Sequence, residues 1–198
     1  MPDPRTLAVY DAKAGDYADL VTQSEPDADL AAFMADLPAA AAVLDLGCGP
    51  AQASAFLRAA GHHPDPVDAS PGMVALANDT HAIGARLATF DDISGQHIYD
   101  GIWANFSLLH APRADLPRHL AALAATLKPG GVFHIGMKTG TGELRDSIDR
   151  LYTYVTIPEL TALLTDAGLT PYATREGAEA GLSGEVAPFV IIRARKHG

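Results

Sequence analysis

Three acidic residues are placed where their carboxylates could bind the hydroxyl and amino groups of a nucleoside. Asp45 precedes the turn Gly47-Cys48-Gly49, Asp68 ends the next apolar segment, and Asp92 ends the one after it. Carboxylates accept hydrogen bonds from ribose hydroxyls and from an exocyclic amine. Glycines lack a Cβ atom and let the backbone turn sharply and approach a ligand closely. If these residues follow parallel strands, they meet at one edge of a sheet and form a site for a nucleoside-like cofactor.

His110 is the candidate for proton transfer, because it comes just after the strand expected over residues 99–105. A neutral imidazole accepts a proton near neutral pH, and a base is needed where the reacting group must lose one. The pairs His62-His63 and Asp91-Asp92 are adjacent residues without a visible third ligand. We therefore expect no metal site at either pair.

The elements that position these residues alternate between strand and helix patterns. This order predicts a Rossmann-like, doubly wound α/β fold, with a mostly parallel, seven-stranded sheet and helices on both faces. Strands are expected at 41–46, ending at 68, ending at 92, at 99–105, at 132–137, at 169–175 and at 186–195. Helices are expected in two pieces within 4–36, at 50–60, from 71 onward, over 116–127 and at 158–167.

Prolines and their neighbours mark several boundaries of these elements. Ser70-Pro71 is a helix start, with a hydroxyl at the N-cap and proline at the first helical position. Pro50 is expected at the first position of the preceding helix for the same reason. Pro64 and Pro66 predict a short second strand, because proline cannot donate to the hydrogen-bond ladder of a central strand.

The glycine turn is compatible with two kinds of nucleotide-like cofactor. Dinucleotide-binding enzymes use the spacing G-x-G-x-x-G, whose third glycine packs the helix on the strand. Here Gly47 and Gly49 fit, but Gln52 stands at the third position, and Asp45 is not part of that pattern. An acid at the position of Asp68 fits either kind. A nicotinamide-dependent oxidoreductase, using NAD or NADP, therefore stays open as the weaker alternative.

Four segments resemble the class I S-adenosylmethionine (SAM)-dependent methyltransferases. The stretch Asp45-Leu46-Gly47-Cys48-Gly49-Pro50-Ala51 resembles their motif I, D-x-G-x-G-x-G, with Ala51 at the last glycine. The segment 99–110 resembles the strand-four motif of small bacterial members, and Leu127-Lys128-Pro129-Gly130-Gly131 resembles the turn that leads into their fifth strand. Residues 153–168 are similar to the corresponding element of tellurite-resistance-type methyltransferases. The resemblance covers nearly the whole chain and implies SAM as the cofactor.

The resemblance also implies roles for individual residues. Asp68 would bind both ribose hydroxyls, and Ala69 and Met73 would pack on the adenine. Asp92 and Ile93 would recognise the adenine edge by side chain and by backbone N–H, with Asp91 in this role if the register differs by one. The expected cofactor site comprises Asp45, Gly47, Cys48, Gly49, Asp68, Ala69, Met73, Asp92, Ile93, Asn105 and Tyr17.

The expected function is methyl transfer from SAM to a compact small-molecule acceptor, with His110 as the candidate base. The N-terminal helices, residues 1–36, would cap the site, and residues 140–156 would form a lid. A non-catalytic protein that binds SAM or a nucleoside for regulation is the alternative from another class. An intact cofactor motif without a pocket for an acceptor would favour that alternative.

Composition narrows the class of protein further. A chain of 198 residues with 48% hydrophobic residues can bury a full core, and we expect one domain over 1–198. The formal net charge of −10 argues against nucleic acid as a partner. No apolar stretch reaches the ~20 residues that span a bilayer. The N-terminal sequence lacks a signal-peptide pattern and the chain has 1 cysteine, so we expect a cytoplasmic monomer or homodimer that binds no membrane.

Overall fold

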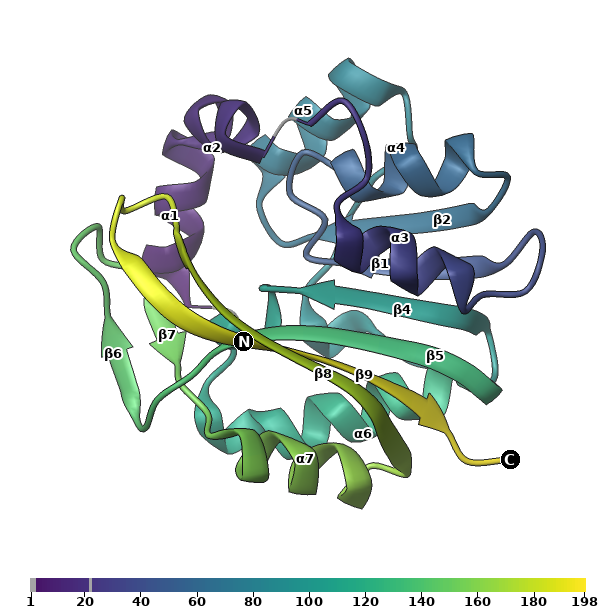
Figure 1. The fold of residues 1–198 in the computed structure, drawn as a ribbon. Helices are drawn as coiled ribbons and strands as arrows, with labels where there is room; N and C mark the ends of the chain where they lie inside the picture. The colour runs from purple at the N-terminus through teal and green to yellow at the C-terminus, as the bar shows by residue number, and fades with distance from the viewer. Residues whose placement is uncertain (1–2, 22) are drawn as a thin grey trace.

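The computed structural model describes residues 3–21 and 23–198, and a seven-stranded sheet forms its centre (Figure 1). The strand order is β3-β2-β1-β4-β5-β9-β8. The first five strands in this order run parallel to one another. β9 is antiparallel to both β5 and β8. The sheet confirms the predicted Rossmann-like fold. Its strands are β1 (Ala42–Leu46), β2 (His63–Asp68), β3 (Arg86–Leu87), β4 (Tyr99–Asn105), β5 (Leu127–Lys138), β8 (Leu169–Ala180) and β9 (Val186–Lys196).

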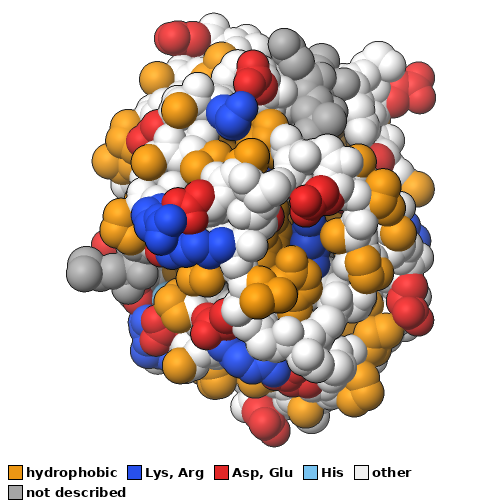
Figure 2. Space-filling view, turned by 90° about the vertical axis from the view of Figure 1, so that its left-hand side faces the viewer, with side chains coloured by type: hydrophobic (Ala, Val, Ile, Leu, Met, Phe, Trp, Pro, Cys, Tyr) orange, Lys and Arg blue, Asp and Glu red, His pale blue; other side chains and the backbone are white. Residues whose placement is uncertain are grey.

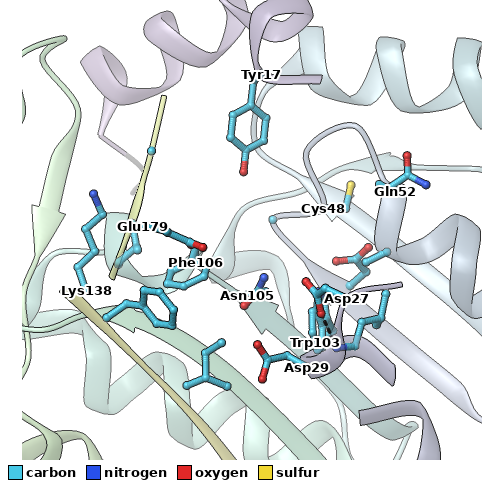
Figure 3. Close-up of a pocket in the computed structure, with 18 of the residues that line it drawn as sticks. Tyr17, Asp27, Asp29, Cys48, Gln52, Trp103, Asn105, Phe106, Lys138 and Glu179 are labelled. Carbon is cyan, nitrogen blue, oxygen red and sulfur yellow. Dashed lines mark hydrogen bonds between the residues drawn. The ribbon is translucent and has the colours of Figure 1, made fainter. Parts of the chain in front are cut away.

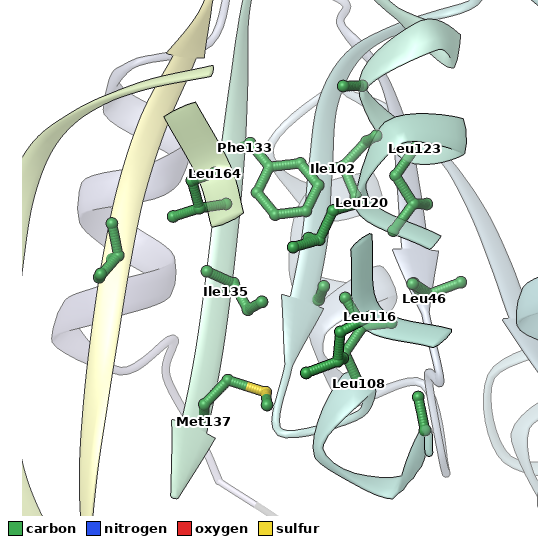
Figure 4. Close-up of a cluster of buried hydrophobic side chains, with 14 of the residues drawn as sticks. Leu46, Ile102, Leu108, Leu116, Leu120, Leu123, Phe133, Ile135, Met137 and Leu164 are labelled. Carbon is green, nitrogen blue, oxygen red and sulfur yellow. The ribbon is translucent and has the colours of Figure 1, made fainter. Parts of the chain in front are cut away.

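Helices cover both faces of the sheet, because successive side chains of each strand point to opposite sides. In β1, Val43 packs with residues of α3 and α4, whereas Leu44 and Leu46 pack with residues of α6 and α7. Figure 4 shows the second of these clusters, the larger part of the core. The helices are α3 (Ala28–Ala35), α4 (Gln52–Ala59), α5 (Pro71–His81), α6 (Leu116–Thr126) and α7 (Ile157–Asp166).

The chain leaves β1 toward β2 on one side and later returns to β4 on the other side. The carboxyl ends of β1 and β4 therefore flank the point at which the strand order reverses. Open α/β sheets bind their ligands in the crevice at this point. The glycine turn after β1 and the tip of β4 both lie there.

The third strand is shorter than predicted. β3 covers only Arg86–Leu87, and Phe90–Asp92 forms a 3₁₀ turn instead of the strand end. The side chain of Asp92 accepts hydrogen bonds from the N–H and the hydroxyl of Thr89, both at 2.8 Å. Short polar side chains that bond the local backbone in this way favour turns over strands.

The helix after the glycine turn also begins later than predicted. α4 starts at Gln52, and Pro50 lies in the turn ahead of it. The residue between them, Ala51, has φ +60°, a left-handed conformation that favours glycine. The prediction at Ser70-Pro71 is confirmed, because the Ser70 hydroxyl accepts a hydrogen bond of 3.1 Å from the N–H of Met73.

The second strand is longer than the prolines predicted. β2 spans six residues and contains both Pro64 and Pro66. The N–H of His63 donates to Ala41 of the β1 side at 2.8 Å, so the alternating nitrogens of the two prolines face away from β1. On that side β3 pairs only with Val67 and Asp68. The missing N–H groups thus fall at an open edge, where proline is tolerated.

Two segments stand over the carboxyl ends of the strands. The first consists of α1 (Pro4–Ala12) and α2 (Ala14–Val21), and the second is the hairpin of β6 (Glu143–Arg145) and β7 (Leu151–Thr153). The two lie beside one another (Figure 1), and the N–H of Leu151 donates to the Thr6 hydroxyl at 2.9 Å. Residues 1, 2 and 22 of the predicted N-terminal cap lie outside the described residues.

On the face that carries these segments, acidic and basic side chains are mixed with hydrophobic ones (Figure 2). Within the described part of the chain, none of the helices is both apolar enough and long enough for a membrane span.

Candidate active site

Two cavities meet at the carboxyl ends of β1 and β4. The larger has a volume of about 330 Å³ and the smaller of about 90 Å³. The larger one falls within the range of small-molecule sites, roughly 300–1,000 Å³. Figure 3 shows side chains from the N-terminal helices, the glycine turn, β4, β5 and β8 around the larger cavity. Both cavities are lined by Tyr10, Tyr17, Gly47, Asn105 and Phe106.

The glycine turn is packed so closely that both glycines are required. Gly47 has φ +70°, and a Cβ atom there would lie 2.5 Å from Cβ of Ser107. Gly49 has φ +53°, and a Cβ atom there would lie 3.2 Å from Cε1 of Tyr17. The turn therefore exposes bare backbone to the cavities, with the Tyr17 ring beside it.

Asp68 lies at the tip of β2 and lines the smaller cavity together with Ala69 and Met73. Its Oδ2 accepts a hydrogen bond of 2.8 Å from the N–H of Gly49, and its Oδ1 accepts one of 2.9 Å from the N–H of Ser70. Burial raises the pKa of this carboxyl, although the backbone N–H groups oppose the shift. Asp68 thus joins the glycine turn to the start of α5 at the place where a ribose was expected.

Asp45 lines the larger cavity but is itself buried. Its Oδ2 accepts a hydrogen bond of 2.7 Å from the hydroxyl of Ser54 in α4, and burial raises its pKa to about 7. Cys48 beside it is a free, buried cysteine, and burial raises the pKa of its thiol. Both residues therefore lie at the larger cavity, with Asp45 joining the turn to α4, and their predicted contact with the cofactor stays a prediction.

The tip of β4 combines an oriented amide with a strained backbone. Oδ1 of Asn105 pairs with Nε2 of the buried His134 at 3.1 Å, while its Nδ2 has no partner among the described residues (Figure 3). The next residue, Phe106, has φ +54°, a conformation rare for a bulky side chain. Such backbone strain costs about 1–3 kcal/mol and gathers at functional sites. Here it places the Phe106 ring in the wall of both cavities.

His110 lies half-buried against the N-terminal cap, at the edge of the smaller cavity. Its Nδ1 lies 2.7 Å from the carbonyl oxygen of Leu151, and its Nε2 lies 2.8 Å from the hydroxyl of Tyr10. A carbonyl only accepts, so Nδ1 carries the proton and Nε2 accepts from Tyr10. Burial lowers the pKa of His110 to about 4, which keeps the ring neutral at pH 7. Its predicted catalytic role stays a prediction.

The adenine-edge residues expected at the third strand tip are not brought to either cavity. Asp92 is held by Thr89 at the surface, and Ile93 is buried in the core. Asp91 pairs instead with Arg118, at 2.6 Å. The lining of the smaller cavity comes from Ala88 and Phe90, because the strand ends earlier than expected and the chain turns at once.

Several lining residues lie outside the predicted site. Arg150 is buried, forms an ion pair of 2.7 Å with Asp146, and donates to the Tyr10 hydroxyl at 2.9 Å. Lys138 at the end of β5 and Phe189 of β9 also line the larger cavity. None of these belongs to a local motif, so only the folded arrangement reveals them. Across the described residues, no group of three or more His, Cys, Asp or Glu side chains could hold a metal ion.

The chain is similar to known methyltransferases. A family model described as a methyltransferase domain matches residues 43–131, from β1 into β5. The 1,6-didemethyltoxoflavin-N1-methyltransferase of Burkholderia thailandensis, solved with bound 1,6-didemethyltoxoflavin and S-adenosylhomocysteine, is 26% identical. That match has a TM-score of 0.71 and covers 96% of this chain and 88% of that chain. No curated protein sequence matches the chain.

Two further solved structures, both less than 25% identical, share the fold. TehB from Haemophilus influenzae has a TM-score of 0.74 at 19% identity, over 93% of this chain and 67% of that chain. A chain of the complex between the Haloferax volcanii Trm112 methyltransferase activator and a methyltransferase has a TM-score of 0.74 at 20% identity, over 98% of both chains. The family match over residues 43–131 and the 26% identical Burkholderia thailandensis relative support a class I SAM-dependent methyltransferase.

Proposed function

We propose that this enzyme transfers the methyl group of SAM to a small-molecule acceptor that enters the larger cavity. The observation that carries the proposal is the meeting of two cavities at Gly47 and Asn105. The smaller one has the acid and the apolar walls that suit a nucleoside. The larger one leaves room for an acceptor beside it, which a protein that only binds SAM would not need.

The residues present fit the parts of the cofactor. Because Gly47 and Gly49 have no side chain, the cofactor can come close to their backbone, and the carboxylate of Asp68 can accept hydrogen bonds from the ribose hydroxyls. Ala69 and Met73 offer apolar contacts to an adenine, together with Phe90 in place of the residues first expected. The free Nδ2 of Asn105 and the ring of Tyr17 suit the methionine part. Asp45 and Cys48 contribute by holding the turn in shape.

SAM supplies an activated methyl group, so the protein has to align the acceptor and exclude water rather than activate the donor. Aromatic side chains do both here. Tyr10, Tyr17 and Phe106 wall the junction of the two cavities, and their ring faces attract a positively charged sulfonium. The strained backbone of Phe106 fixes its ring at this junction.

A base is required only for an acceptor that loses a proton during the transfer. In the present arrangement Nε2 of His110 is occupied by the Tyr10 hydroxyl. Tyr10 therefore faces the acceptor cavity and takes the proton that the acceptor loses, while its own hydroxyl proton passes to Nε2 of His110. The neutral state of His110 keeps this lone pair available.

The segments that cover the site support a small acceptor. The N-terminal helices and the β6–β7 hairpin are joined over the cavities by the hydrogen bond between Leu151 and Thr6. The Burkholderia thailandensis relative, whose solved structure contains 1,6-didemethyltoxoflavin, supports an acceptor of this kind. The free thiol of Cys48 and the net charge of −10 support a cytoplasmic enzyme that does not act on nucleic acid, and we propose that it is a monomer or homodimer.

The test is transfer of a labelled methyl group from SAM in a cell extract, separated by size into metabolites, proteins and nucleic acids. The proposal predicts label in the metabolite fraction and none above background with heat-inactivated enzyme. Label confined to protein or nucleic acid would contradict the small-molecule acceptor. No labelled product in any fraction, with S-adenosylhomocysteine still bound, would contradict the acceptor cavity.

A further inference from the structure

Lys138, at the end of β5, is a half-buried cation that has no counter-ion among the described residues. Its side chain lines the larger cavity (Figure 3). Its ammonium forms no hydrogen bond and no ion pair with the described residues, and lies 4.5 Å from the centre of the Tyr152 ring. The other three lysines each have oxygen partners: Lys13 with Asp16, Lys128 with Asp100, and Lys196 with the carbonyls of Ala125 and Leu127.

The acids around the cavity are already engaged or too distant to neutralise Lys138. Asp146 pairs with Arg150, and Asp29 pairs with Arg175. Glu179 and Glu185 attract Lys138 electrostatically, yet neither carboxylate of these described residues comes within 4 Å of its ammonium. Burial lowers the pKa of Lys138, and the positive charge of Arg150 adds to the shift. A charge that is removed from water is stable only when it is paired. The Lys138 end of the larger cavity therefore lacks an anion, among the described residues, that would pair with the ammonium.

The walls between Lys138 and the glycine turn are aromatic. Phe106 and Phe189 meet edge to face at 5.3 Å, and Tyr152 lies under the ammonium. All three side chains line the larger cavity, which reaches Gly47 at its other end. The turn between β8 and β9 closes the Lys138 end, because a carbon added on Gly181 would lie 3.7 Å from Nζ. A flat apolar body fits between these rings, with its charged end at Lys138.

We propose that the methyl acceptor is a small, flat, apolar molecule that carries an oxyanion such as a carboxylate, and that Lys138 binds this anion. The inference rests on the proposed function, since it names the chemical class of the acceptor for the same cavity. Binding the anion at Lys138 leaves the opposite end of the molecule toward Gly47 and Asn105. The charge of Lys138 thus selects the acceptor and sets its direction in the cavity.

The test uses matched pairs of probes that differ in charge and little in shape: benzoate and benzamide, 4-hydroxybenzoate and 4-hydroxybenzamide, and indole-3-carboxylate and indole-3-carboxamide. Each is titrated by NMR into the full-length enzyme saturated with S-adenosylhomocysteine. The wild type should bind at least one carboxylate about fivefold or more tighter than its amide, because a charge-assisted hydrogen bond is stronger than a neutral one. Lys138→Met should abolish this preference, and Lys138→Arg should keep it.

Lys13→Met, on the exposed end of α1, is the control and should leave the preference unchanged. All variants should bind S-adenosylhomocysteine as the wild type does. Equal binding of acids and amides, a preference that survives in Lys138→Met, or no carboxylate binding at all would overturn the proposal. A loss of S-adenosylhomocysteine affinity in Lys138→Met would overturn it too, because Lys138 would then hold the cofactor. Failure of the wild type to bind S-adenosylhomocysteine would instead refute the proposed function.

Discussion

The hydroxyl of Tyr10 in the N-terminal helix lies 2.8 Å from Nε2 of His110, a residue that follows β4. The same hydroxyl accepts a hydrogen bond from Arg150, and the other nitrogen of His110 bonds the carbonyl of Leu151. One phenol thus joins the cap, the tip of the sheet and the β6–β7 hairpin. The cap is therefore held over the cavities by partly buried hydrogen bonds as well as by packing.

Removing this hydroxyl should loosen the cap. We expect Tyr10→Phe to lower the free energy of unfolding by about 1–3 kcal/mol, since Arg150 and His110 each lose a partly buried hydrogen-bond partner. Urea denaturation measures the change. Tyr154→Phe is the matched control, because its hydroxyl has no hydrogen bond to the described residues, and should change stability by less than about 0.5 kcal/mol. Equal stability of the two variants would contradict this role of Tyr10.

Asp68 should matter for cofactor affinity. We expect Asp68→Ala to weaken the binding of S-adenosylhomocysteine by about 1–3 kcal/mol, the size of a lost charge-assisted hydrogen bond. Isothermal titration calorimetry gives the affinity. The control is Asp65→Ala on the same strand, where the carboxylate bonds Arg86 and Tyr99 outside both cavities. Wild-type affinity in Asp68→Ala would show that the ribose binds elsewhere.

Gly47 should tolerate no side chain. Gly47→Ala adds a Cβ atom 2.5 Å from Ser107 at a φ of +70°, whereas Gly61→Ala adds one in open space at +86°. The left-handed conformation costs about 1–2 kcal/mol in both variants, and the clash adds about 1–3 kcal/mol in the first. Thermal unfolding compares them. In the double variant Gly47→Ala with Ser107→Gly, the part of the destabilisation that comes from the clash with Ser107 should disappear. No recovery there would mean that something other than Ser107 limits the turn.

Asp45 should make stability fall with rising pH. Its pKa of about 7 in the folded protein lies above the ordinary value of 3.8, so the folded state holds the proton more tightly than the unfolded state. The free energy of unfolding, relative to Asp45→Asn, should decrease between about pH 4 and pH 7 by about 1.4 kcal/mol per unit and then stay constant. Urea titrations at each pH give both curves, and other groups cancel in the difference.

Asp65 is the control, because its effect on the free energy of unfolding should depend on pH in the opposite direction. Burial alone would raise its pKa, but the hydrogen bonds from Arg86 and Tyr99 hold the pKa below its ordinary value. Stability relative to Asp65→Asn should therefore be lost as the pH falls through the acid range. A difference between wild type and Asp45→Asn that does not vary with pH would contradict a protonated Asp45.

The parts of the fold that follow from local patterns could be predicted from the sequence. The apolar run before Gly47 gives β1, the residues 99–105 give β4, and Ser70-Pro71 begins α5. These patterns predict structure correctly because they depend on hydrogen bonds between residues close in sequence, or on apolar residues that pack along a whole strand. The alternation of strands and helices also predicts the mostly parallel, doubly wound sheet.

The parts that depend on distant contacts could not be predicted. Nothing near Tyr10 in the sequence indicates that it contacts His110 and Arg150. The proposed role of Lys138 depends on the folded arrangement, because only that arrangement shows that none of the described carboxylates pairs with its ammonium. The predicted end of the third strand at residue 92 was wrong because local hydrogen bonds compete with strand pairing. The hydrogen bonds between Thr89 and Asp92 form a turn, so the strand ends early. Phe106 carries no sequence signal for its left-handed backbone conformation.

The most direct test is a crystal structure of the enzyme with bound S-adenosylhomocysteine. We predict the ribose hydroxyls within hydrogen-bond distance of Asp68, the adenine between Met73 and Phe90, and the sulfur at the junction near Gly47 and Asn105. The larger cavity should remain open toward Lys138. A nucleoside bound away from the glycine turn, or a cofactor that fills the larger cavity as far as Lys138, would contradict the account.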